Sequence, residues 1–250
     1  MSFQHCILGI VASAAAFGLS PASAQAGSFS ISPLRADLSA SAQTGALTLR
    51  NQEAAPVVVQ AQAMLWEQAD GQEQLTPTRD VLVNPAVFTL PANGSQLVRV
   101  ALRRPADAQR ELTYRLILTE VPQPASPDFT GLNVALRLSL PVFVAPSAAK
   151  AEPRLEWTAD RTADGTVAIT ARNAGNAHAR VVNFSVAPAA GSATAIPQDV
   201  TAYVLPGQAR TWTLDKKHNE TTSGTDWNQL RVKGTTEAGD FEVETRLGER

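Results

Sequence analysis

The sequence predicts an all-β fold built as two successive halves. Apolar residues recur at every second position more often than with a helical period, and Gly, Pro, Asn and Asp interrupt them at short intervals. Such alternation is typical of strands that have one buried and one exposed face. Only residues 106–109 lean toward a helix, and that stretch is too short to form an independent element.

Residues 1–26 have the features of a secretory signal peptide. An apolar run from Ile7 to Leu19 is followed by small residues that match an A-x-A cleavage pattern, ending at Ala24 or Ala26. The run is too short to span a bilayer. The only cysteine, Cys6, lies in this segment, so we expect an exported protein whose stability does not depend on disulfides. No later stretch reaches 18 apolar residues, so we expect no direct membrane insertion.

The first half, residues 27–146, contains about seven predicted strands in some 120 residues. That number and spacing favour an immunoglobulin-like β-sandwich. The predicted strands are Ser28–Ile31, Ala46–Asn51, Pro56–Glu67, Val87–Leu90, Gln96–Leu102, Leu112–Val121 and Leu132–Val144.

A short segment of small residues and prolines, 147–153, predicts a linker, and a second β-sandwich is expected over 154–250. Its predicted strands are Leu155–Thr158, Thr166–Asn173, His178–Val186, Thr201–Val204, Arg210–Leu214, Trp227–Val232 and Phe241–Arg246. The halves echo each other, because Leu47–Asn51 and Ile169–Asn173 are similar alternating strands that both end in Arg-Asn. We therefore expect two sandwiches of related design.

Composition and motifs argue against nucleic-acid binding and against catalysis. The 21 Lys and Arg nearly balance the 23 Asp and Glu, and the isoelectric point is about 5.9, which lacks the basic surplus of a phosphate-backbone binder. The only histidines after the signal, His178 and His218, are not spaced as metal ligands, and we expect both at the surface. Serine-hydrolase and nucleotide-binding motifs are absent from the sequence. We expect no enzyme activity, metal or cofactor.

The most informative segment is the last predicted strand of the first half. Its even positions from 132 to 142 are all large aliphatic residues, and its odd positions up to 141 are Asn, Ala, Arg, Ser and Pro. One face is thus an apolar ridge about 30 Å long. Two interpretations remain open: the ridge points into the core of its own sandwich, or its upper part is lent to a partner that lacks a strand.

Six segments in order resemble the N-terminal domain of periplasmic pilus chaperones of the chaperone-usher pathway, the PapD-like family. They are Ser30–Arg35, Leu47–Asn51, Ala86–Pro91, Gln96–Val100, Tyr114–Leu116 and Leu140–Pro146. The Ser-Leu-Pro-Val-Phe-Val ending and the cysteine-free body are most similar to the branch that serves spore-coat-U-type fimbrial subunits. This resemblance implies two immunoglobulin-like sandwiches set as an L.

The resemblance also implies a function. Chaperones of this family complete a fimbrial subunit by donor-strand complementation and deliver it to an outer-membrane usher. The positions that match the donor strand are Leu132, Val134 and Leu136, with Leu138 as a continuation.

In this family, two basic residues bind the C-terminal carboxylate of the subunit. Arg35 matches the first of them, and a guanidinium can bind a carboxylate bidentately. The family's second basic residue falls at Pro141, so Arg137 on the same strand or Arg99 on a neighbouring strand is a candidate substitute. We interpret Tyr114 and Arg115 mainly as structural support.

The sequence therefore predicts a periplasmic, non-enzymatic chaperone whose partners are fimbrial (pilin) subunits and the usher. The sequence favours two other classes less. A fimbrial structural subunit or adhesin would be a single incomplete sandwich with its own donor extension. A periplasmic carbohydrate-binding sandwich would need clustered aromatic or paired acidic residues, whereas the four tryptophans are scattered along the chain.

Overall fold

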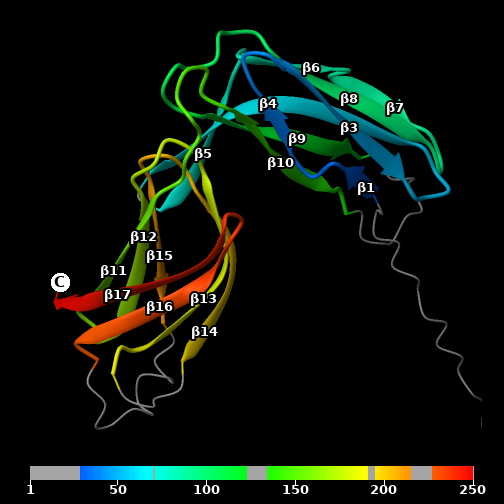
Figure 1. Cartoon of the computed structure of the whole chain (residues 1–250). Coiled ribbons are helices and arrows are strands. Elements are labelled where there is room, and N and C mark those ends of the chain that lie inside the picture. Colours follow the sequence, from blue (N-terminus) through cyan, green and yellow to red (C-terminus); the bar gives the residue numbers. More distant parts are fainter. Residues whose placement is uncertain (1–28, 70, 123–133, 191–194, 215–226, 250) are drawn as a thin grey trace, which may run out of the picture.

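The computed structural model describes residues 29–69, 71–122, 134–190, 195–214 and 227–249, and these residues form strands and no helix. The predicted signal peptide lies outside the described residues. Strands β1 to β10 make one domain and β11 to β17 a second, and the two domains meet at an angle, as in an L (Figure 1). The strands of the first domain are β1 Phe29–Ser32, β2 Ala36–Leu38, β3 Thr44–Asn51, β4 Val57–Ala69, β5 Gln72–Pro77, β6 Val81–Asn84, β7 Val87–Leu90, β8 Ser95–Leu102, β9 Leu112–Val121 and β10 Arg137–Val144.

The first domain is a sandwich of two sheets. One sheet has the order β1-β3-β8-β6, and the other has the order β2-β10-β9-β4-β5, with β7 also paired to β4. The inward residues of both sheets form one core, which includes Leu47, Val98, Leu116 and Val142. The alternation that predicted these strands is therefore the alternation that fills the core.

The chain changes sheets between β1 and β2. Strand β1 pairs antiparallel with β3 in one sheet, whereas β2 pairs parallel with the end of β10 in the other. The crossing takes three residues, 33–35, and leaves Arg35 immediately before the first paired residue of β2.

The second domain contains β11 Leu155–Arg161, β12 Val167–Asn173, β13 Ala179–Pro188, β14 Ile196–Val204, β15 Ala209–Thr213, β16 Gln229–Thr236 and β17 Gly239–Glu249. They pair in the order β14-β13-β16-β17-β11-β12-β15. Its core has an aromatic centre, in which Trp157 stacks on Phe241 at 4.9 Å between ring centroids and approaches Phe184 and Trp212.

The repeated Arg-Asn ending has the same structural role in both domains. The side chain of Asn51 donates to the carbonyls of Ala55 and Pro91, and the side chain of Asn173 donates to those of Ala177 and Val204. Each asparagine oxygen accepts the amide two residues later. Both side chains are fully buried, and each one forms hydrogen bonds with backbone groups of the turn that follows its strand.

Most predicted strands are present, and the differences are local. Three short strands, β2, β5 and β6, were not predicted. The last strand of the first domain was predicted from Leu132, but residues 134–136 are not in a strand and β10 begins at Arg137. The start at Leu132 is therefore wrong for the described residues, because regular pairing with β9 ends at Arg137↔Thr119.

Candidate functional site

Over about half its length, strand β10 pairs on one side only with the described part of the chain. Its whole length pairs with β9, but β2 covers only Val142–Val144 on the other side. The amide of Glu120 donates to the carbonyl of Leu136 at 2.9 Å, and that of Ala145 donates to the carbonyl of Leu38 at 2.9 Å. Even residues thus turn their backbone groups toward β9 and odd residues toward β2. Among the described residues, the backbone groups of Arg137 and Ser139 therefore face an open edge.

The even side chains along this open half become more exposed toward its start. Leu140 is buried, Leu138 and Leu136 are partly buried, and Val134 is 48% exposed. Leu136 and Leu138 line a narrow crevice with Phe29, Leu49 and Val59 between the two sheets. Leu132, the remaining predicted donor residue, lies outside the described residues. The open half therefore offers both an unpaired edge and a row of apolar side chains.

Arg35 lies where the two domains approach each other. Its register position, one residue before the pair Ala36↔Val142, corresponds to Pro141 on β10. Its guanidinium donates to Asp37 at 2.8 Å and also to Glu237, which belongs to the second domain. Burial lowers the pKa of Arg35, but the hydrogen bonds and charges of these carboxylates outweigh it and hold that pKa above its ordinary value.

The structure separates the other two predicted basic residues from Arg35. Arg137 is exposed on β10, four residues from Pro141 and so about 13 Å along the strand from the register position of Arg35. Arg99 is exposed on β8, which belongs to the opposite sheet of the sandwich. The sandwich core lies between Arg99 and the strand that carries Arg137.

Arg115, which the sequence analysis interprets as structural support, has contacts of that kind. It lies on β9 directly opposite Pro141, but its guanidinium stacks at 3.6 Å from the ring centroid of Trp66 and contacts Glu73 at 3.4 Å. Burial lowers the pKa of Arg115 below its ordinary value. Because its side chain is only 11% exposed, its contacts are those of structural support.

An aromatic cluster joins the domains beside the end of β10. Trp66 and Phe143 of the first domain pack against Tyr203 and Leu205 of the second. His178 stacks on Phe143 with 3.6 Å between ring centroids, and its Nδ1 lies 2.8 Å from a carboxylate oxygen of Glu111. The expectation of a surface histidine is therefore wrong for His178, whose side chain is 14% exposed. His218 lies outside the described residues.

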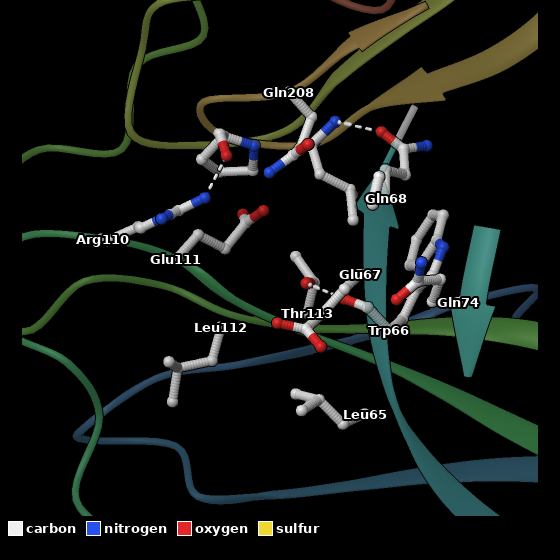
Figure 2. Close-up of a pocket in the computed structure, with 13 residues that line it drawn as sticks. Leu65, Trp66, Glu67, Gln68, Gln74, Arg110, Glu111, Leu112, Thr113 and Gln208 are labelled. Carbon is white, nitrogen blue, oxygen red and sulfur yellow. Dashed lines mark hydrogen bonds between the residues drawn. The ribbon is translucent and has the colours of Figure 1, made fainter. Parts of the chain in front are cut away.

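Polar contacts strengthen this interface. The side chain of Gln68 donates to the carbonyl of Tyr203 at 2.9 Å and accepts the amide of Leu205 at 3.0 Å. Figure 2 shows the cavity beside these contacts, which measures about 320 Å³ and is lined from both domains. Arg110 reaches across it to the carbonyl of Pro206. Hydrogen bonds from Gln68 and Arg110 thus connect the two domains beside the aromatic cluster.

Two features are absent from the described part of the chain. No three His, Cys, Asp or Glu side chains gather there as a metal site would require. The described residues form no helix that is long and apolar enough to cross a membrane.

Comparisons with known proteins agree with this geometry. Residues 28–150 match the family described as pili and flagellar-assembly chaperone, PapD N-terminal domain. No curated protein sequence matches the chain.

Solved structures of pilus chaperones share the two-domain fold. A chain of the CsuC–CsuE chaperone and tip subunit complex of archaic Csu pili from Acinetobacter baumannii has 18% identity and a TM-score of 0.64, and the match covers 89% of this chain and 99% of that one. The YadV chaperone has 18% identity and a TM-score of 0.60 over 88% of this chain and 99% of that one. A chain of the Salmonella enterica SafA pilin and SafB chaperone complex has 20% identity and a TM-score of 0.58 over 89% and 98%.

The matched residues contain β1 to β10, and therefore both Arg35 and the open edge of β10. The predicted all-β fold of two sandwiches is confirmed, and so is the predicted resemblance. Residues 28–150 of this chain therefore belong to the PapD-like family of non-enzymatic pilus-assembly chaperones.

Proposed function

We propose that this protein captures fimbrial subunits by donor-strand complementation along the open half of β10. The observation that carries the proposal is the unpaired edge at Arg137–Ser139, next to apolar side chains that become more exposed from Leu138 to Val134. A subunit that lacks a strand would expose apolar surface and strand edges, and would aggregate without a partner. Backbone hydrogen bonds and apolar side chains supplied by β10 would cover both, without any ATP.

The donor residues in this proposal are Leu132, Val134, Leu136 and Leu138. Val134, Leu136 and Leu138 follow the alternation that a groove between two sheets requires. Each would fill one part of the groove of the subunit, while the backbone of the odd residues pairs with the neighbouring strand of the subunit.

Arg35 is the proposed anchor for the C-terminal carboxylate of the subunit. It lies next to the boundary between the open and the covered halves of β10, so a subunit strand held there by its terminus would run along the open edge. Arg137, further along that edge, is the proposed second basic contact for the subunit. Arg99 is left out of the anchor, because it belongs to the opposite sheet.

The family's pathway supplies the remaining parts of the proposal. The chaperone would pass its subunit to an outer-membrane usher and work in the periplasm, after removal of residues 1–26 as a signal peptide. Residues 27–146 and 154–250 would then be the two working domains, joined by 147–153. A fimbrial subunit or a carbohydrate-binding sandwich is not favoured, because the family consists of assembly chaperones.

Co-expression with a fimbrial subunit tests the proposal. We expect a soluble one-to-one complex, and Arg35→Ala should weaken it about ten- to hundredfold, because a hydrogen bond to a charged group contributes about 1.5–3 kcal/mol. Arg99→Ala is the matched control, since it removes an exposed arginine from the opposite sheet and should leave binding unchanged. Equal recovery of the soluble subunit with and without this protein would contradict the chaperone function.

A further inference from the structure

The guanidinium of Arg35 is already bound to carboxylates within the chain. Asp37, two residues away, accepts from Nε, and Glu237 of the second domain accepts from Nη1. A guanidinium offers two edges that bind a carboxylate bidentately, the Nε side and the Nη end. Asp37 occupies the nitrogen Nε of the first edge, and Glu237 occupies the nitrogen Nη1 of the second. A further carboxylate can bind Arg35 bidentately only by displacing one of them.

Glu237 is held at this position by its own turn. It lies in the connection between β16 and β17, and its amide donates to the carbonyl of Arg180 at 3.0 Å. The hydroxyl of Thr236 closes the same turn by donating to the carbonyl of Gly239 at 2.9 Å. The second domain therefore presents a carboxylate to Arg35 from a partnered backbone.

Of the two carboxylates, Glu237 is the one that an incoming group can replace. Asp37 belongs to β2, which is hydrogen-bonded to β10 and therefore fixed beside Arg35. Glu237 reaches Arg35 from another domain, and its contact is broken by a rotation of its side chain or by a small separation of the domains. Its side chain is 38% exposed, so water can solvate the carboxylate once it is released.

We propose that Glu237 is an internal competitor for the carboxylate site of Arg35, occupying the guanidinium until the terminal carboxylate of a subunit displaces it. This inference rests on the proposed function, specifically on Arg35 as the anchor. The exchange replaces one carboxylate by another, so the charge of Arg35 stays neutralised before and after capture. It also releases a contact between the two domains, which links subunit binding to the freedom of the second domain.

The competition is expected to be modest. The side chains of Arg35 and Glu237 are 36% and 38% exposed, and ion pairs in such positions are weak because water screens them. Removing the charge of Glu237 should therefore strengthen carboxylate binding at Arg35 by about two- to fivefold.

Acetate tests the inference without any subunit. Acetate is titrated into the full-length protein at constant ionic strength, with binding followed by the NMR signal of the Arg35 side-chain Nε–H. We expect Glu237→Gln to lower the acetate midpoint about two- to fivefold relative to the wild type. Glu244→Gln is the matched control: it removes an exposed carboxylate of β17 that pairs with Arg231, and it should leave the midpoint unchanged.

An acetate midpoint for Glu237→Gln equal to that of the wild type overturns the inference, because Glu237 would then be only a tie between the domains. The same result for Glu237→Gln and Glu244→Gln overturns it as well, since a general change in net charge would explain both. Subunit capture by Arg35→Ala separates this outcome from failure of the proposed function. If Arg35→Ala loses capture and Glu237→Gln leaves the acetate midpoint unchanged, Arg35 remains the anchor but Glu237 is not a competitor. If Arg35→Ala captures the subunit as well as the wild type does, both the anchor and the competitor are ruled out.

Discussion

The two halves of β10 both carry aliphatic residues at their even positions, but they have different surroundings. From Leu140 to Val144 every residue is buried, and β2 and β9 flank the strand at Val142–Val144. From Arg137 to Ser139, β9 is the only pairing strand among the described residues, and the odd side chains are exposed. The side chains of the covered half pack into the hydrophobic cores. The backbone groups of Arg137 and Ser139 in the open half face an edge without a paired strand among the described residues.

This difference shows that the neighbours of a strand decide its role. Aliphatic residues at even positions suit a core of the chain itself and an open groove in a partner equally well. The deciding feature is the length of β2, because its three paired residues cover one half of β10 and stop at Ala36. A free edge of this kind is a liability in a folded protein unless a partner uses it.

Phe143→Ala tests the covered half and should have the largest effect. Phe143 is 2% exposed and packs between Trp66 and His178, so its truncation leaves a cavity between the domains. We expect the free energy of unfolding to fall by about 3–5 kcal/mol. Urea denaturation followed by tryptophan fluorescence measures it. A loss below about 1 kcal/mol would mean that the covered half is not a part of the core.

Val134→Asp tests the open half. Val134 is 48% exposed, so the free energy of unfolding should change by only about 0.5 kcal/mol or less. Capture of the subunit should weaken by about a hundredfold or more, because a carboxylate would be placed in an apolar groove without a partner. A binding titration against the fimbrial subunit measures the second effect. Loss of stability with intact capture would reverse the roles assigned to the two halves.

The sequence predicted the strands of the fold better than it predicted the contacts that individual side chains make. Long alternating strands such as β4 and β9 were predicted because periodicity over about ten residues is hard to mistake. Strand β2 was missed because three residues do not establish a period. That short strand is also the one that divides β10 into its two halves.

Contacts between the domains could not be predicted from local pattern. The ion pair between Arg35 and Glu237 spans 202 residues, and that between Glu111 and His178 spans 67. His178 was expected at the surface because it follows a turn-like segment at the start of a predicted strand, but the fold stacks its ring on Phe143. Arg35 itself was identified through the family resemblance, since nothing in its local sequence marks it as part of a site between domains.

Glu111→Ala tests the partners of the covered half. The carboxylate of Glu111 accepts a hydrogen bond from the backbone amide of His178 at 3.0 Å. It also lies 2.8 Å from Nδ1 of the His178 ring. Truncation leaves these buried groups without their partner, so we expect a loss of about 1–3 kcal/mol in the free energy of unfolding. Urea denaturation measures it, with Glu244→Ala as a control at an exposed position of β17. Equal values for the two variants would mean that Glu111 does not support the interface.

Pro141→Ala tests the boundary between the halves and should have the smallest effect. Odd residues of β10 turn their backbone groups toward the side of β2, and Pro141 has no amide to present there, just before the pairing with β2 begins. Alanine gives the unfolded chain more conformational freedom, so stability should fall by about 0.4–1 kcal/mol. It also adds a backbone amide on the side of β2. A rise in stability would instead show that the new amide pairs with the segment before β2. The covered half would then have been lengthened at the expense of the open one, and binding of the subunit should weaken in the same variant.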